Sequence, residues 1–149
     1  MSILVYTESE QGKFKKIALE AVSYAKGIAD MTGTTVTAVA FNGGDAAELG
    51  KYGASKVLEV NDSKLEKFNA KAYAAAIQQA AEKESAQVVV LSSSANSKYL
   101  APLLAINLNA ALASNVVALP EGTAPFKVKS SAFTNKAFAH TELNADVKV

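Results

Sequence analysis

The sequence contains no cysteine, no tryptophan and a single histidine. The lack of cysteine excludes disulfides, thiolate metal ligands and thiol nucleophiles, and it agrees with a reducing compartment. One histidine without cysteine is a poor donor set for a transition metal, so we predict no metal site. No apolar run approaches the ~18 residues that a membrane span needs. The short run Ile3–Tyr6 lacks the basic flank of an export signal. We therefore expect a cytoplasmic protein that is not inserted in a membrane.

An excess of charge of one sign is also missing. The 15 basic residues are balanced by 14 acidic ones, which leaves a net charge of +1. This balance selects neither nucleic acid nor anionic lipid as a partner. What the sequence does contain is an ordinary globular composition, 50% hydrophobic and 19% charged over 149 residues. A chain of this length forms about one domain and can bury a core without covalent cross-links.

Short apolar runs alternate with segments of helical periodicity along residues 3–120. The predicted strands are Ile3–Tyr6, Val36–Phe41, Val57–Val60, Val88–Leu91 and an apolar run that ends at Pro120. The predicted helices lie at 14–33, 45–53, 70–83 and 99–112. This alternation predicts a three-layer α/β/α fold around a five-stranded parallel sheet. Ile3–Tyr6 and Val88–Leu91 are apolar at successive positions, which is typical of strands covered on both faces.

The pattern changes after Pro120. Phe126–Ser130, Lys136–Thr141 and Asp146–Val149 alternate apolar with polar residues, and only turns separate them. We predict a short antiparallel excursion at the edge of the domain. The last residues, Asp-Val-Lys-Val, resemble a strand interrupted in mid-run, so we expect the sequence to be truncated at its C-terminal end.

Catalytic groups are sparse, and we predict no catalytic residue. His140 lies in an alternating strand pattern without a nearby acid in the sequence, which favours a structural or surface role. Glu8 and Glu10 share one loop and could form an acid/base pair, but a solvated loop is the better interpretation.

Phosphate-binding motifs are incomplete. Gln11-Gly12-Lys13 lacks the second glycine and the Ser or Thr of a P-loop. Gly43-Gly44 favours a turn over a nucleotide contact. Ser92, Ser93 and Ser94 follow a strand and precede a helix, where hydroxyls and helix-terminal amides can bind an anion or a cofactor group. Helix capping by these serines is the alternative that we favour.

Lys98 near the start of the predicted helix is placed against the helix dipole. Such a placement makes it a candidate contact with a carboxylate of a protein partner. A solvated lysine whose aliphatic stem lies over the helix is the alternative.

Four segments resemble the alpha subunit of electron transfer flavoproteins. Ser97–Leu103 is similar to the family pattern Gly-Lys-(Asn/Asp)-Leu-(Leu/Ala)-Pro-Arg, and Ser114–Val116 to its Ser-Asp-Val. Ile3–Glu8 resembles the family's opening strand, and Phe133–Ala137 its Tyr-Ala-Gly-Asn-Ala segment. The resemblance runs over all of residues 1–149, but only over the N-terminal half of such a subunit.

Three positions depart from the family pattern. Ser97 replaces the usual glycine, Leu103 the arginine and Asn115 the aspartate. If the arginine and the aspartate make polar contacts in the family, those contacts are in doubt for this chain.

The resemblance implies a fold and a function. It implies the strand order 3-2-1-4-5 of adenine-nucleotide-alpha-hydrolase-like domains, and it makes residues 1–149 an alpha-type N-terminal domain without the flavin-binding C-terminal domain. The complete alpha–beta heterodimer would hold FAD and pass electrons from flavin dehydrogenases, including those of fatty acid β-oxidation, to the respiratory chain. The protein would be an electron carrier and not an enzyme, with a beta subunit as partner and no cofactor in this portion.

Two other classes of function share parts of this pattern. A universal-stress-protein-like domain that binds adenine nucleotides has the same rhythm of strands and helices, but its glycine-rich loop would fall where Ser92–Lys98 stands without glycine. A small α/β hydrolase or transferase would need a nucleophile–base pair, which the sequence lacks.

Overall fold

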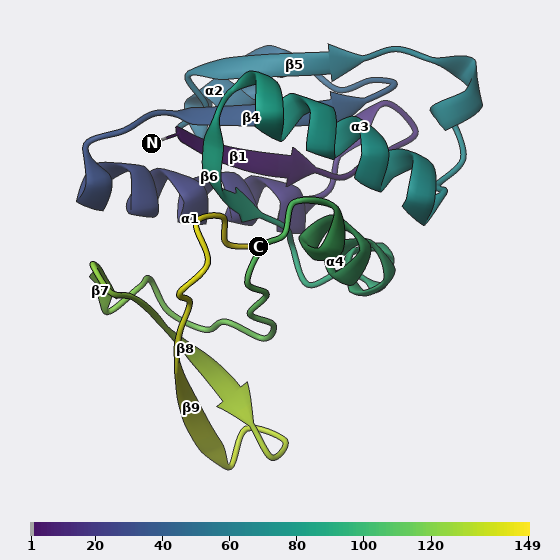
Figure 1. Ribbon diagram of the computed structural model, residues 1–149. Helices are drawn as coiled ribbons and strands as arrows, with labels where there is room; N and C mark the ends of the chain where they lie inside the picture. Colours follow the sequence, from purple (N-terminus) through teal and green to yellow (C-terminus); the bar gives the residue numbers. More distant parts are fainter. Residues whose placement is uncertain (1) are drawn as a thin grey trace.

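A parallel sheet lies at the centre of the computed structural model, which describes residues 2–149 (Figure 1). The described strands of this sheet are β1 (Ser2–Thr7), β4 (Val36–Phe41), β5 (Lys56–Val60) and β6 (Ala86–Val90). They pair in the order β5-β4-β1-β6, and every pair is parallel. Ile3 of β1 aligns with Val36 on one side and with Val88 on the other. This confirms the predicted order 3-2-1-4 of the first four strands, with Ile3–Tyr6 in the middle.

Helices cover both faces of the sheet (Figure 1). They are α1 (Lys16–Thr32), α2 (Ala46–Lys51), α3 (Ala70–Lys83) and α4 (Ala95–Asn107), with a short 3-10 helix η1 at Ser63–Leu65. Because successive strand side chains point to opposite faces, Ile3 and Val5 pack with α1, whereas Leu4 and Tyr6 pack with α3 and α4. The predicted three-layer α/β/α class is confirmed.

The helix ends follow local chemistry. Gly33 ends α1 in the left-handed conformation, with φ 65°, which glycine adopts without strain. Asp45 and Asn69 cap α2 and α3 with their side-chain oxygens. Ser94 does the same for α4, which therefore begins at Ala95 and not at Tyr99 as the apolar spacing predicted.

The prediction that the apolar run ending at Pro120 forms the fifth strand of the central sheet is wrong. Val116 bridges Ser130 in antiparallel fashion, outside the central sheet. Val117 and Leu119 are 52% and 45% exposed, so this apolar run does not have the burial of a central strand. Its composition resembles that of a buried strand, but the place beside β6 is taken by other residues.

The place beside β6 is taken by the last residues described. Lys148 is parallel to Val88 on one side and to Ala111 on the other. The prediction that Asp146–Val149 is part of the antiparallel excursion is therefore wrong. These residues return to the parallel sheet because β6 offers an unpaired edge to them.

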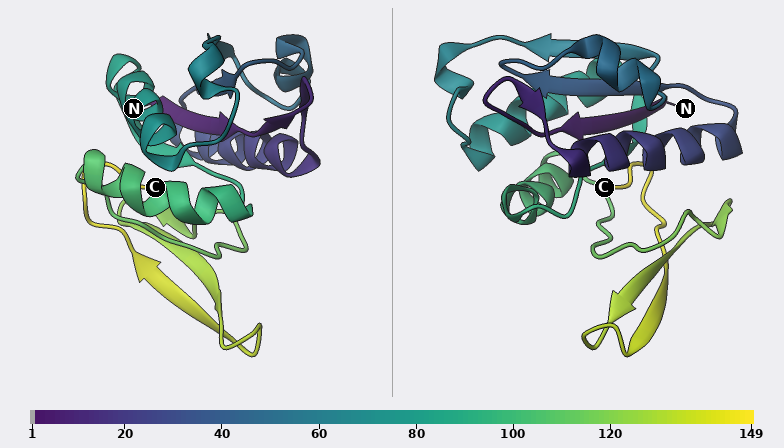
Figure 2. Two further views of the ribbon diagram at one scale, coloured as in Figure 1. Left: turned by 90° about the vertical axis from the view of Figure 1, so that its right-hand side faces the viewer. Right: turned by 180° about the vertical axis from the view of Figure 1, so that it is seen from behind.

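The rest of the excursion is confirmed. β7 (Gly122–Thr123), β8 (Phe126–Ala132) and β9 (Ala137–Glu142) form an antiparallel sheet. The β8–β9 hairpin projects away from the central sheet in both views of Figure 2. Its turn, Phe133-Thr134-Asn135, has three successive left-handed residues.

Candidate functional site

The serine loop lies at the carboxyl end of β6. The Ser94 hydroxyl accepts a hydrogen bond from the Ser97 N–H at 3.1 Å and donates one to the Ser97 Oγ at 3.0 Å. Ser94 is therefore the helix cap that the sequence suggested. Ser92 is buried, and Ser93 is exposed. The three serines thus have three different environments, and anion binding by Ser92, Ser93 and Ser94 stays a prediction.

Glu8 is a buried carboxylate at the carboxyl end of β1, and it is only 4% exposed. Its Oε1 accepts hydrogen bonds from the Lys15 Nζ at 2.6 Å and from the Asn96 Nδ2 at 3.3 Å. The prediction of a solvated loop is wrong for Glu8, because these two donors compensate the burial of its charge. It holds for Glu10, whose side chain is 71% exposed.

The contacts of Glu8 connect three elements. Asn96 belongs to the first turn of α4, and Lys15 immediately precedes α1. The Lys15 backbone N–H also donates to the Glu8 carbonyl at 3.0 Å. The hydrogen bond with Glu8 is the main cause that raises the pKa of Lys15. Glu8 therefore fixes the start of α4 relative to β1 and α1.

Two buried side-chain atoms lack a hydrogen-bond partner among residues 2–149. They are the Glu8 Oε2 and the Ser92 Oγ, which follow the adjacent strands β1 and β6. An unpaired buried polar atom costs free energy, roughly 1–3 kcal/mol. The carboxyl ends of neighbouring parallel strands are also where open α/β sheets bind ligands. Both atoms mark this edge as the candidate site.

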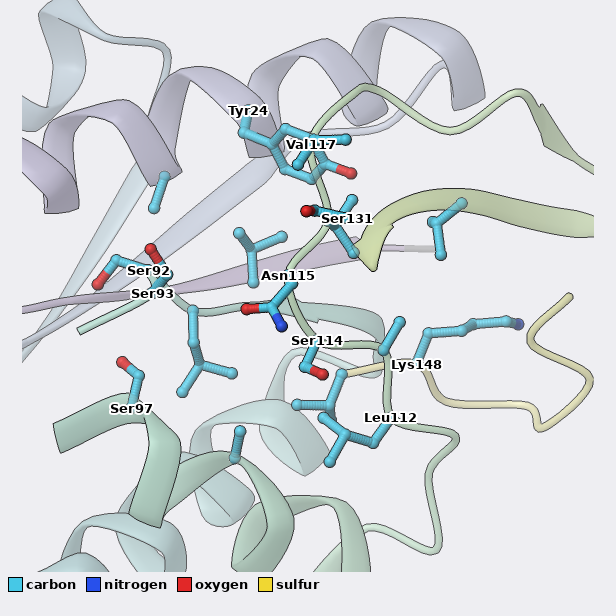
Figure 3. Close-up of a pocket in the computed structure, with 18 of the residues that line it drawn as sticks. Tyr24, Ser92, Ser93, Ser97, Leu112, Ser114, Asn115, Val117, Ser131 and Lys148 are labelled. Carbon is cyan, nitrogen blue, oxygen red and sulfur yellow. The ribbon is translucent and has the colours of Figure 1, made fainter. Parts of the chain in front are cut away.

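A cleft of about 1070 Å³ opens beside the serine loop. Ser92 and Ser93 lie on one side of it, and Ser114 and Asn115 lie on the other (Figure 3). The Tyr24 hydroxyl of α1 donates to the Ala118 carbonyl at 3.0 Å at its rim. Burial raises the pKa of Tyr24 to about 12.

Helix α4 exposes a surface that we call the α4 face, which consists of an apolar stripe of Tyr99, Pro102 and Ile106 with Lys98 at its edge. Tyr99 and Ile106 are 71% and 77% exposed, although both are large hydrophobic residues. The spacing of Tyr99, Pro102 and Ile106 places them on one side of a helix. The opposite side of α4 packs through Leu100 and Leu104 against α3 and the sheet. Lys98 forms none of the ion pairs found within residues 2–149.

The glycine motifs form turns. Gln11 and Gly12 are left-handed and connect β2 (Ser9–Glu10) to β3 (Lys13–Phe14), an antiparallel hairpin. Gly43 and Gly44 also have positive φ, and a Cβ on Gly44 would lie 2.3 Å from the Phe14 ring. The predicted turn at Gly43-Gly44 is confirmed.

His140 lies on β9, and its Nδ1 is 2.9 Å from the Glu121 Oε2. Sequence inspection missed this acid because the antiparallel pairing of β7, β8 and β9 brings the two residues together. Their side chains are 50% and 40% exposed, which agrees with the predicted surface role. Residues 2–149 contain no cluster of three or more His, Asp or Glu side chains suited to a metal ion. No helix in the same span is long and apolar enough to cross a membrane.

A parallel sheet covered by helices on both faces makes this an α/β domain with three layers. The chain matches the family described as "Electron transfer flavoprotein domain" over residues 3–149. It belongs to that family. The resemblance seen in the sequence is therefore confirmed.

Two curated relatives carry the name "Electron transfer flavoprotein subunit alpha". The protein of Syntrophomonas wolfei subsp. wolfei is 28% identical over 142 residues, which cover 93% of this chain and 44% of the relative. The protein of Bacillus subtilis is 28% identical over 122 residues, covering 77% of this chain and 36% of the relative. The chain thus spans less than half the length of either relative.

One solved structure is similar to this chain in outline. It is described as a universal stress protein in complex with cAMP. The two chains are 12% identical, with a TM-score of 0.45, and the match covers 71% of this chain and 90% of the other.

Proposed function

We propose that residues 1–149 are the N-terminal domain of an electron transfer flavoprotein alpha-type subunit, with the flavin-binding domain outside this sequence. The domain binds a beta-type subunit and supports the heterodimer that carries FAD. The complete protein transfers electrons from flavin dehydrogenases to the respiratory chain, in the cytoplasm. Family membership and the name of both curated relatives support this proposal.

The observation that carries the proposed role is the α4 face. Exposed aromatic and aliphatic side chains that lie together on one helix are costly in water and are typical of protein interfaces. Tyr99 and Ile106 supply the apolar area, and Lys98 supplies a cation at the edge of the stripe. A complementary partner surface would present an apolar groove with a carboxylate beside it.

Glu8 gives this face a fixed position. Its bond to Asn96 holds the first turn of α4 against the end of β1. Leu100 and Leu104, both 0% exposed, anchor the same helix in the core. A face on a rigid helix loses little conformational entropy on association, which favours affinity.

The same geometry supports the expectation that this portion binds no FAD by itself. A flavin site needs groups that hold the isoalloxazine, the pyrophosphate and the adenine within one enclosed cleft. Here Ser94 is used as a helix cap, and Gly12 forms a hairpin turn distant in sequence from the serine loop. We infer that FAD is held elsewhere in the complete heterodimer.

The test is a binding titration by calorimetry with the cognate beta-type subunit. The double variant Tyr99→Ser, Ile106→Ser should weaken binding at least ~10-fold, since buried aromatic and aliphatic anchors dominate interface energies. The matched control is Phe133→Ser, which removes a ring from the hairpin turn that is 81% exposed, against 71% for Tyr99. It should bind like the parent.

Melting curves of all variants should coincide, because the substituted side chains are exposed. Equal affinity of the α4 double variant and the parent would reject the α4 face as the docking site. Failure of the parent itself to bind would reject the proposed function.

A further inference from the structure

Strand β9 forms one edge of the antiparallel sheet, because the order of that sheet is β7-β8-β9. Neither view of Figure 2 shows another helix or strand beside β9 on the side away from β8. Five of the six residues of β9 are exposed. This side of the strand is therefore open to a further strand.

The backbone bonds of β8 show which residues of β9 point to the open side. On the side of β8 away from β9, the Ser131 N–H donates to the Asn115 carbonyl at 2.9 Å. On that same side, the Val117 N–H donates to the Lys129 carbonyl at 3.0 Å. The backbone groups of successive strand residues point to alternate sides, so Ser130, between these two, bonds toward β9.

Ser130 is aligned with Ala139, so Ala139 and every second residue of β9 bond to β8. The N–H and C=O groups of Phe138, His140 and Glu142 therefore point to the open side. β9 pairs with no other strand, and none of these groups takes part in the backbone bonds that residues 2–149 form outside their strands. With one donor and one acceptor on each residue, the edge presents six unpaired groups.

The edge lacks the features that usually prevent a strand from pairing with another chain. Such features are a proline, a bulge, a lysine on the strand or a very short strand. β9 has six residues, AFAHTE, without proline or lysine. Its register with β8 is regular from Ala137 to Glu142. The backbone of β9 is therefore suited to accept a neighbour.

The side chains of Phe138, His140 and Glu142 share one face of the hairpin with two lysines of β8. The Lys129 Nζ lies 4.0 Å from the centroid of the Phe138 ring. The Lys127 Nζ lies 3.2 Å from the Glu142 Oε1. The strand thus has an aromatic ring with a cation near its start and a carboxylate at its end.

We propose that β9 pairs with β9 of a second copy of this chain, antiparallel, about a two-fold axis at His140. In this register His140 lies opposite His140 of the second copy, and Phe138 lies opposite its Glu142. All six backbone groups of each edge then form hydrogen bonds. A register shifted by two residues would leave one of the three residues of each edge unpaired.

Charge also favours a second copy as the occupant. Glu142 of one copy would lie beside the Lys129–Phe138 pair of the other, so a carboxylate meets a cation at both ends of the interface. The same surface serves both subunits, as a two-fold interface requires. This inference is independent of the proposed function, because it uses the hairpin and not the α4 face.

Sedimentation velocity of the purified chain over a concentration series tests the proposal. The parent should reach twice its mass of 15.5 kDa, with a Kd in the micromolar range. His140→Pro removes an N–H that faces the second copy and none that bonds to β8, and proline is tolerated on sheet edges. It should weaken the dimer at least ~100-fold. The matched control, His140→Ala, keeps the N–H and should dimerise like the parent.

A second pair of variants tests the charge. Lys129→Glu would bring carboxylates of the two copies together and should weaken the dimer ~10-fold. Lys136→Glu makes the same change of charge in the exposed turn of the hairpin, outside the proposed interface. It should dimerise like the parent, as should the double variant Tyr99→Ser, Ile106→Ser of the α4 face.

Amide hydrogen exchange locates the contact without any substitution. The amides of Phe138, His140 and Glu142 should exchange at least ~10-fold more slowly in the dimer than in the dilute monomer. Three results would overturn the proposal: a monomer at every concentration, equal dimerisation of His140→Pro and His140→Ala, or a dimer in which these three amides exchange as fast as in the monomer.

Discussion

Strands β1 and β9 have six residues each and lie in opposite kinds of environment. Five residues of β1 are buried and one is half-buried, whereas five residues of β9 are exposed and one is half-buried. β1 pairs with strands on both sides and is covered by helices on both faces. β9 pairs with β8 alone. The parallel layer therefore depends on side-chain burial, and the hairpin depends mainly on its backbone ladder.

The hairpin itself divides into a buried base and an exposed tip. Phe126 and Val128 of β8 join the core on the α1 face and are 5% and 3% exposed. Phe133 in the turn is 81% exposed, and Phe138 is 55% exposed. The base belongs energetically to the central domain, and the tip does not.

The largest effect should come from a charge placed in the parallel layer. Val89→Asp or Leu104→Asp buries an unpaired carboxylate, which costs several kcal/mol. This cost is comparable with the total stability of about 5–15 kcal/mol expected for a domain. Circular dichroism should show an unfolded protein for each variant. A cooperative melt within a few degrees of the parent would show that the substituted residue is not part of the core.

The base and the tip of the hairpin should differ clearly. Phe126→Ala should lower the free energy of unfolding by about 3 kcal/mol, because it leaves a cavity against the α1 face. Phe133→Ala should change it by less than about 0.5 kcal/mol. Urea denaturation of both variants measures the difference. Similar losses for the two would mean that the tip is packed as tightly as the base.

A smaller effect is expected at the loop after β1. Glu8→Gln weakens the bonds to Lys15 and Asn96 and should cost about 1 kcal/mol, discounted because the Lys15 side chain is 33% exposed. Glu10→Gln is the control, since Glu10 is exposed and 3.7 Å from the same amine. Its free energy of unfolding should equal that of the parent. Equal losses for the two variants would contradict the distinction drawn between these glutamates.

The smallest expected effect is a loss of stability at alkaline pH. Burial, followed by the Glu8 charge, raises the pKa of Tyr6 above its ordinary value of 10.0. The hydrogen bond with Glu8 raises the pKa of Lys15 above 10.5. Both groups keep their protons longer in the folded state, so stability is fully present below these ordinary values and is lost as pH rises through the raised ones.

Denaturation at a series of pH values from 8 upward checks this decline. Tyr6→Phe should flatten the curve above pH 10 by removing the tyrosine contribution. A parent whose stability rises above that pH would contradict the sign.

The parallel layer was predictable because its strands are continuous apolar runs in the sequence and its helices have apolar residues at helical spacing. The sequence pattern alone was enough to predict the strand Val88–Leu91 and the helix at 70–83. The strand expected before Pro120 failed, because the partner of β6 is Lys148, which is distant in sequence. Composition indicates that a segment is apolar but not which edge it pairs with.

The candidate site was only partly predictable. Ser94 has the chemistry of a helix cap, and the sequence suggested that role. Glu8 was assigned to solvent because its partner Asn96 is 88 positions away. The sequence did contain one signal for the role of Glu8, namely its place as an acidic residue directly after a buried strand. The α4 face was not predicted from the sequence, because the helix was expected to begin at Tyr99 and not at Ala95.

The central claim is that this domain recognises a protein surface and does not itself hold the flavin. Fluorescence titration of FAD with the purified chain tests it most directly, since bound isoalloxazine is commonly quenched. We predict a colourless protein and FAD that keeps its free fluorescence throughout the titration. Stoichiometric quenching with micromolar affinity would contradict the account.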